Sequence, residues 1–128
     1  MKFGYTIFYV PDVKAAIAFY EKAFELKRGM VTEEGHYGEM QTGETKLCFA
    51  NRELRPESLD LQASDAKSAV PPFEIAFVTD DVETSFRTAV KAGCERILGP
   101  TKKPWGQIVS YVRDLNGFLV EICTPVTK

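Results

Sequence analysis

The sequence predicts an α+β fold made of two tandem modules, each with the order strand, helix, strand, strand, strand. A β-rich run followed by an Asp-Val pair occurs at residues 5–13 and again, 69 residues later, at residues 74–82. Helical spacing of apolar residues follows both pairs. The last two strands of each half are joined at a glycine, Gly43 or Gly117. This ordered repetition predicts an internal repeat rather than two unrelated segments.

The first module covers residues 1–50. Residues 3–10 are rich in aromatic and β-branched residues and predict a strand that ends at Pro11, after which Asp12 is a favourable helix N-cap. The next apolar residues recur at steps of four, three and four, as on one face of a helix: Val13, Ile17, Tyr20 and Phe24. Three short strands are then predicted, at 29–32, 36–41 and 45–50.

Residues 51–72 contain three prolines and no regular period, which indicates a connector with at most one short turn of structure. The second module, residues 73–128, starts with a strand over 73–79. A helix over 82–92 follows, with Gly93 as its C-cap. A short strand over 95–98 and a Gly99-Pro100 turn are predicted next.

The stretch 105–126 predicts a hairpin, because Asn116-Gly117 supplies the positive φ of a tight turn. With a three-residue bulged loop, Tyr111 stands opposite Glu121. One face then mixes polar and apolar residues: Gln107, Val109, Tyr111, Leu119, Glu121 and Cys123. The other face is apolar enough to pack on a helix: Ile108, Ser110, Val112, Phe118, Val120 and Ile122. A carboxylate in mid-strand marks the first of these faces as the candidate site.

Composition excludes several classes of function. The net charge of −2 provides no field for nucleic acid or an acidic membrane surface. The three cysteines form no Cys-x-x-Cys pair, which favours reduced thiols and a cytoplasmic location. No apolar run reaches the ~18 residues of a membrane span. At 128 residues, of which 45% are hydrophobic, the chain can form one domain with a substantial core.

The chain resembles the vicinal-oxygen-chelate superfamily, which contains glyoxalase I, bleomycin-resistance proteins and extradiol dioxygenases. The matching motifs lie at 10–13 with 18–24, at 77–82 with 92–93, and at 104–106 with 112–121. The resemblance implies one domain over residues 1–128, in which two βαβββ modules form a curved mixed sheet around a cavity with helices outside. It also implies a homodimer.

The resemblance further implies metal-ligand positions at Tyr5, Glu74, Leu47 and Glu121. Only Glu121 carries the family's commonest ligand, and leucine cannot coordinate a metal. The lone histidine, His36, falls on the opposite face and is expected at the surface or on the helix side. We therefore expect no obligatory cofactor. The alternative is a divalent metal held weakly by Glu74 and Glu121, because carboxylates favour hard ions over zinc or nickel.

The predicted ligand-binding residues combine the carboxylates with aromatic and amide side chains: Tyr5, Tyr37, Glu74, Trp105, Gln107, Tyr111 and Glu121. Glu74 and Glu121 are interpreted as acceptors for a cationic ligand, as an acid–base pair, as half of a magnesium or manganese site, or as inherited hydrogen-bonded positions. Cys123 shares their face but lacks an activating histidine, so it is expected to be a small buried hydrophobe.

The first functional interpretation is a protein that binds a small cationic or aromatic organic ligand in the sheet cavity. The second is a metal-dependent lyase, isomerase or dioxygenase that uses Glu121 as its catalytic residue. The third is an interaction module without a ligand, in which Leu47, Phe49 and Leu119 fill the cavity. The sequence leaves open which of these holds and what the ligand is.

Overall fold

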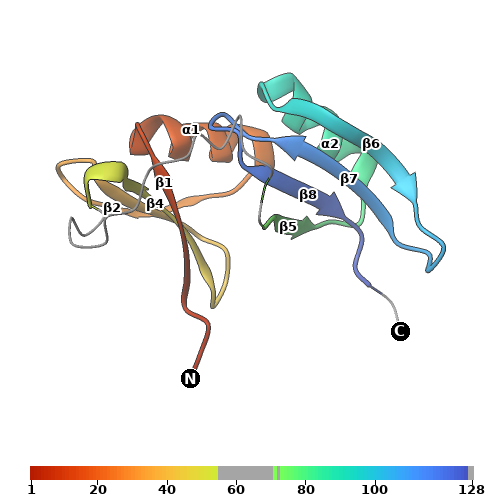
Figure 1. Cartoon of the computed structure of the whole chain (residues 1–128), viewed down its shortest axis with the longest axis horizontal. Coiled ribbons are helices and arrows are strands. Elements are labelled where there is room, and N and C mark those ends of the chain that lie inside the picture. The colour runs from red at the N-terminus through yellow and green to blue at the C-terminus, as the bar shows by residue number, and fades with distance from the viewer. Residues whose placement is uncertain (55–70, 72, 127–128) are drawn as a thin grey trace. The chain divides into compact units, whose positions relative to one another are not determined.

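The computed structural model describes residues 1–54, 71 and 73–126. The chain divides into two compact units, Met1–Ala63 and Ser64–Lys128, and each contains one of the predicted modules. Figure 1 shows one helix and one four-stranded sheet in each unit. The α+β class and the tandem repeat are thereby confirmed.

Module one forms a mixed sheet with the strand order β1-β4-β3-β2. Its elements are β1 (Tyr5–Val10), α1 (Val13–Phe24), β2 (Arg28–Val31), β3 (Tyr37–Met40), β4 (Lys46–Asn51) and the short 3-10 helix η1 (Arg52–Leu54). Strand β1 is parallel to β4, whereas β2, β3 and β4 pair antiparallel. The helix and all four strands of this module agree with the sequence prediction.

Module two repeats this topology with the strand order β5-β8-β7-β6. Its elements are β5 (Ile75–Val78), α2 (Val82–Ala92), β6 (Glu95–Lys102), β7 (Ile108–Arg113) and β8 (Leu119–Cys123). Strand β5 is parallel to β8, and β6, β7 and β8 pair antiparallel. The two modules therefore share both element order and strand pairing.

Both helices begin at the predicted aspartates. The Asp12 carboxylate accepts the Ala15 N–H at 3.0 Å, and the Asp81 carboxylate accepts the Thr84 N–H at 3.0 Å. These bonds satisfy N–H groups that the first helical turn leaves without a partner. The predicted C-cap, Gly93, has a φ of 118° and closes α2.

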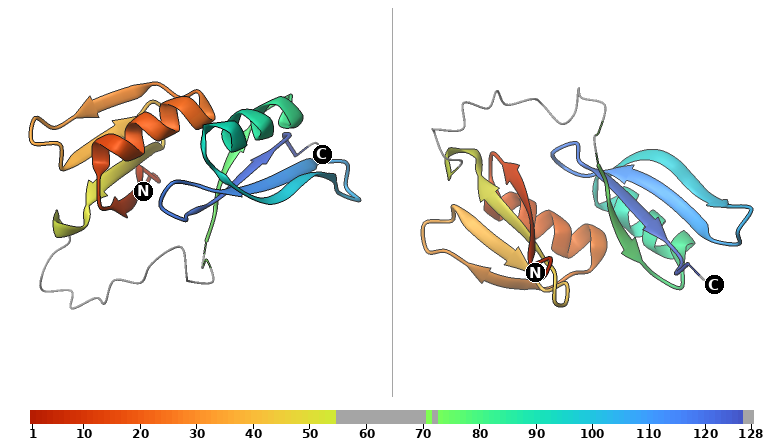
Figure 2. Two further views of the ribbon diagram at one scale, coloured as in Figure 1. Left: turned by 90° about the horizontal axis from the view of Figure 1, so that it is seen from above. Right: turned by 60° about the horizontal axis from the view of Figure 1, so that its bottom comes forward.

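Each helix covers one face of its own sheet (Figure 2). In module one, the Tyr20 ring of α1 packs on the Phe49 ring of β4 with centroids 4.8 Å apart. A Cβ at Gly38 would overlap Ile17 of α1, so glycine allows the helix to approach β3 closely. In module two, the core consists of buried residues of α2, β7 and β8: Val82, Phe86, Ala89, Val112, Val120 and Ile122. We call the other face of each sheet its open face.

The hairpin of module two has the predicted register, with Tyr111 paired with Glu121. The Asp114 N–H donates to the Phe118 carbonyl at 2.9 Å, and Gly117 adopts a φ of 90°. The Asp114 carboxylate also accepts the N–H groups of Asn116 and Phe118. These bonds fix the loop, and with it the side of the sheet on which Glu121 lies.

The prediction for residues 95–100 was wrong in one respect. Strand β6 continues through Gly99-Pro100 to Lys102, where the sequence indicated a turn. Proline lacks an N–H for the ladder, but β6 is an edge strand, and its register with β7 shifts between Leu98 and Thr101. Within the described part of the predicted connector, residues 52–54 form the short 3-10 helix η1, and positions 55–70 and 72 lie outside the described residues. In the described part of the chain, no helix has the length and apolar character needed to cross a membrane.

Candidate functional site

The open face of module two brings together the ionisable residues of β5, β7 and β8. Glu121 and Cys123 project from β8, and Tyr111 lies opposite Glu121 on β7. Glu74 directly precedes β5, whose Ala76 is paired with Glu121. The side chains of Glu74, Tyr111, Glu121 and Cys123 influence one another electrostatically, which places all four on the same side of the sheet.

At the centre of this cluster, the carboxyl groups of Glu121 and Glu74 lie close enough to share a hydrogen bond. Two carboxylates have only acceptors, so this bond requires a proton. Burial raises the pKa of Glu121 from 4.5 to about 7, and the hydrogen bond and charge of Glu74 act in the same direction. The Cys123 thiol and the more distant Lys103 ammonium lower that pKa by smaller amounts. The pair is thus poised to exchange its proton near neutral pH.

Tyr111 and Cys123 border the carboxyl pair as neutral groups. Burial raises the pKa of the Tyr111 hydroxyl, and the charges on Glu121 and Glu74 raise it further. Burial likewise raises the pKa of the Cys123 thiol. Cys123 is 4% exposed and its thiol donates to the Phe77 carbonyl at 3.8 Å, so it is a small buried side chain rather than an activated nucleophile. The Tyr111 hydroxyl has no hydrogen-bond partner within the described residues and can donate to a ligand.

Trp105 and Gln107 lie in the turn that leads into β7. The Trp105 Nε1–H donates to Gln107 Oε1 at 2.9 Å, and Gln107 Nε2 donates to the Thr124 carbonyl at 2.9 Å. Gln107 is also hydrogen-bonded to the Cys123 thiol. The structure therefore links four of the predicted side chains of module two, Trp105, Gln107, Glu121 and Glu74, through contacts that include Cys123.

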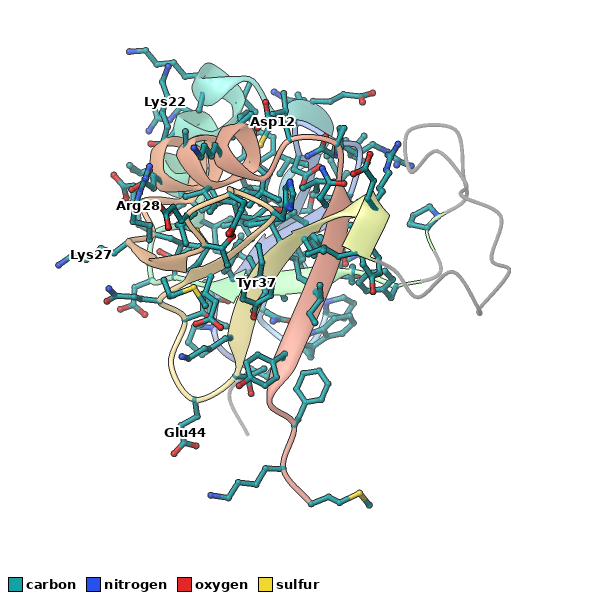
Figure 3. All side chains as sticks on the ribbon, turned by 90° about the vertical axis from the view of Figure 1, so that its left-hand side faces the viewer. Asp12, Lys22, Lys27, Arg28, Tyr37 and Glu44 are labelled. Atoms are coloured by element: carbon teal, nitrogen blue, oxygen red, sulfur yellow. The ribbon has the colours of Figure 1, made fainter. Side chains whose placement is uncertain are left out.

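The open face of module one carries a second polar cluster. The Tyr37 hydroxyl donates to Glu39 Oε2 at 2.9 Å and lies 3.2 Å from Cys48 Sγ. Lys46 Nζ forms an ion pair with Glu39 Oε1 at 3.1 Å. The Tyr37 hydroxyl and then the Lys46 ammonium lower the pKa of Glu39. Figure 3 shows Tyr37 over the strands of this module, whereas Lys27 and Glu44 project from its periphery.

Sequence reasoning missed Glu39 and Lys46. Both occupy alternate positions of short strands, with Glu39 two residues after Tyr37 and Lys46 two residues before Cys48. That period-two spacing is the signal that singled out Glu121, and it was available for Glu39 as well. Tyr5, the other predicted residue of this module, lies on β1 opposite Lys46 and is exposed.

The strand register also corrects one repeat match. Leu47 was predicted to be the module-one counterpart of Glu121. Thr6 pairs with Leu47 on parallel strands, as Ile75 pairs with Val120, so Leu47 matches Val120 and Cys48 matches Glu121. Leu47 lies on the helix side with Phe49, and neither side chain can fill the open face. Matching Gly43 with Gly117 implies a separation of 74 residues between the modules, whereas Cys48 and Glu121 are 73 residues apart, so the predicted match on β4 was wrong by one residue.

The same register changes the match on the neighbouring strands. Cys48 pairs with Glu39 on β3, and Glu121 pairs with Tyr111 on β7. Glu39 therefore matches Tyr111, and Tyr37 matches Val109 rather than Tyr111. Tyr37 still lies on the open face, although its repeat equivalent is an apolar residue.

The positions that the resemblance marks for metal ligands carry different donor atoms in the two modules. They are a phenol and a thiol in module one, Tyr5 and Cys48, and two carboxyls in module two, Glu74 and Glu121. Burial raises the pKa of the Cys48 thiol, which disfavours the thiolate that binds zinc. Among the residues that the structure describes, no three His, Cys, Asp or Glu side chains are grouped so that they could hold a metal ion.

Comparison with protein families matches residues 2–122 to the model of the Glyoxalase/Bleomycin resistance protein/Dioxygenase superfamily. The chain belongs to this superfamily. No protein of curated function matches the sequence significantly. The resemblance proposed from the sequence motifs is thus confirmed at the level of the family.

Several solved structures share the fold at low sequence identity. A glyoxalase-related enzyme from Fulvimarina pelagi is 16% identical with a TM-score of 0.81, over 97% of this chain and 88% of that one. A family enzyme from Burkholderia phytofirmans PsJN is 18% identical with a TM-score of 0.80, over 99% and 100%. TioX from Micromonospora sp. ML1 is 17% identical with a TM-score of 0.76, over 97% and 98%. Likeness at these identities shows the fold, and the site's chemistry is argued from this chain's own residues.

Proposed function

We propose that this superfamily member binds a small organic cation on the open face of module two. The observation that carries the proposal is the hydrogen-bonded pair of Glu74 and Glu121, which forms no ion pair with a Lys or Arg among the described residues. A cation that replaces the shared proton removes the repulsion between the two carboxylates. Charge-assisted hydrogen bonds of this kind contribute about 1.5–3 kcal/mol each.

The groups around the pair favour an aromatic cation. Tyr111 supplies a free hydroxyl, and Trp105 is 59% exposed beside Gln107. A cation or planar ring on an indole gains roughly 0.5–2 kcal/mol. Benzamidine, a planar aromatic cation with two N–H edges, is a suitable probe, and benzamide is its neutral control.

Isothermal titration calorimetry of the purified protein with both compounds tests this function. We expect benzamidine to bind and benzamide to bind at least about tenfold more weakly, because only the amidinium carries charge. Benzamidine affinity should also rise between about pH 6 and about pH 8, as the shared proton is lost. Equal affinity for the two compounds would remove the carboxyl pair from the function.

The alternative, a metal-dependent enzyme, depends on the same two carboxylates. The open face of module two offers no imidazole among its described residues, and its two carboxyl groups are donors suited to hard ions. We therefore propose that zinc and nickel bind weakly or not at all. Elemental analysis of protein purified without added metal tests this proposal. Stoichiometric zinc, nickel or iron that is lost on Glu121→Gln would make the metalloenzyme the better interpretation.

A further inference from the structure

The turn between β6 and β7 holds the only tryptophan of the chain in a constrained position. The Lys103 N–H donates to the Gln107 carbonyl at 2.7 Å, and the Gly106 N–H donates to the Lys103 carbonyl at 2.9 Å. Gly106 adopts a φ of 95°, which glycine permits without strain. Trp105 therefore projects from a tight, internally bonded turn although its side chain is exposed.

The Gln107 side chain connects this turn to the end of β8. An indole N–H can only donate and a main-chain carbonyl can only accept, so the contacts with Trp105 and Thr124 fix the orientation of the amide. Its oxygen accepts from Trp105. Its two N–H groups are used by the Thr124 carbonyl and the Cys123 sulfur. Gln107 consequently has no N–H left to donate to a ligand, although the sequence predicted it as a ligand contact.

The far end of these contacts is the carboxyl pair. The Cys123 thiol donates to the Phe77 carbonyl at 3.8 Å, and it also lies within hydrogen-bonding reach of Gln107 and Glu121. Glu121 in turn lies within hydrogen-bonding reach of Glu74. Gln107 thus bonds directly to the indole and contacts, through Cys123, the residue that carries the carboxyl pair. A side chain held at both of its own ends in this way can fix the place of the ring that it bonds.

We propose that Gln107 is a positioning residue that holds the Trp105 indole at a fixed place beside the carboxyl pair, and that the bound cation accordingly carries its planar ring directly on the charged group. This inference rests on the proposed function for its ligand and names the class within it: an aryl amidine or a similar compact aromatic cation. A cation without a ring uses the carboxyl pair alone and is indifferent to Gln107.

The position of the indole is tested by the single Trp indole N–H signal in proton–nitrogen NMR spectra. Gln107→Met has a similar length but offers no hydrogen bond, and it should move this signal to the position of a solvent-exposed indole and accelerate its exchange with water. A signal that stays in place shows that Gln107 does not hold the ring and overturns the proposal.

Ligand selectivity is tested with benzamidine and with acetamidine, which has the same charged group but no ring. We expect Gln107→Met to weaken benzamidine about three- to tenfold and acetamidine less than about twofold. Trp105→Phe breaks the same hydrogen bond from the other side and should give the same pattern. Because both changes remove one interaction, the double variant should be no weaker than the weaker single variant.

The outcomes separate this inference from the proposed function. If Glu121→Gln abolishes benzamidine binding while Gln107→Met leaves it unchanged, the function stands and the role of Gln107 is refuted. If both amidines weaken equally in Gln107→Met, the residue supports the carboxyl pair rather than the ring, and the proposal is also overturned. If neither amidine binds the unaltered protein, both proposals fail. Should Gln107→Met not fold, Trp105→Phe, a change at an exposed residue, provides the same comparison.

Discussion

Glu39 in module one and Glu121 in module two both stand in mid-strand on the open face of their sheets, and their surroundings differ. Glu39 meets a hydroxyl donor and an ammonium group, which lower its pKa. Glu121 is partly buried and lies beside a second carboxyl group, and both effects raise its pKa, to about 7. A carboxylate whose partners come from its own sheet stabilises that sheet, whereas one without a cationic partner is available to a ligand.

Tyr37 and Tyr111 differ in their hydrogen bonding in the same way as the two carboxylates. Tyr37 is hydrogen-bonded to Glu39 and lies beside Cys48, while the Tyr111 hydroxyl has no such partner within the described residues. Strand pairing is alike in the two modules, and each carboxylate lies on the open face of its sheet, Glu39 on β3 and Glu121 on β8. The difference therefore shows that ligand-binding capacity in this fold depends on which neighbours a strand carboxylate is given.

The largest expected effect separates the two carboxylates by ligand affinity. Glu121→Gln keeps the shape of the side chain and removes its charge, so it should weaken benzamidine about 10- to 100-fold. Glu39→Gln is the matched control and should change the affinity less than about twofold. Calorimetric titration of both variants checks this, and a similar loss in both would show that the two clusters serve one site.

The second comparison concerns stability at about pH 8. Glu39→Gln replaces the charge that pairs with Lys46 and accepts from Tyr37 by a neutral amide, so it should lower the free energy of unfolding by about 1–3 kcal/mol. Glu121→Gln should leave that free energy unchanged or increase it, because it removes repulsion with Glu74. Urea unfolding followed by circular dichroism measures both values. A larger loss for Glu121→Gln would reverse the assignment of structural and functional roles.

The fold was largely predictable because its signals are local. Asp12 and Asp81 cap their helices as expected, and Asn116-Gly117 fixed the hairpin register that placed Tyr111 opposite Glu121. The strand through Gly99-Pro100 was missed because an edge strand tolerates a residue that a central strand excludes.

The candidate site was predictable only in part. Glu121 stood out as a charge among apolar residues, but Lys46, the cationic partner of Glu39, lies on a different strand and cannot be identified without the register. A one-residue error between Leu47 and Cys48 was enough to assign the wrong face, because side chains alternate along a strand. Contacts such as that between Gln107 and Cys123 join side chains that are distant in the sequence, so they cannot be predicted without the strand register.

The pH dependence of stability should have opposite signs for the two carboxylates. The pKa of Glu121 is higher in the folded state, so its contribution to stability is complete below about pH 4.5 and is lost, on the order of 2 kcal/mol, as the pH rises towards 7. The pKa of Glu39 is lower in the folded state, so its contribution is present above about pH 4.5 and is lost as the pH falls through its folded-state pKa. Glu121→Gln should remove the first loss and Glu39→Gln the second.

Urea unfolding at about pH 5 and about pH 8 resolves the Glu121 contribution. The unaltered protein should lose stability between these values relative to Glu121→Gln. Parallel pH profiles for the two proteins would show that the carboxyl pair does not hold its proton.

The smallest expected effect distinguishes the tyrosines. Tyr37→Phe removes a hydroxyl that is hydrogen-bonded to Glu39 and should lower the free energy of unfolding by about 1 kcal/mol. Tyr111→Phe removes a hydroxyl without such a partner and should change it by less than about 0.5 kcal/mol. Thermal unfolding of the two variants provides the comparison, and equal losses would indicate that the Tyr111 hydroxyl is also bonded within the protein.

The most direct measurement is a residue-specific pH titration of the two carboxyl groups by carbon-13 NMR, with Glu39 and Glu121 identified from their Gln variants. We expect Glu39 to titrate below the ordinary pKa of glutamate and Glu121 to titrate well above it, near 7. Benzamidine should lower the pKa of Glu121 and leave that of Glu39 unchanged, because the cation replaces the shared proton. Titration of both groups at the ordinary value for glutamate, with no response to benzamidine, would contradict the central claim.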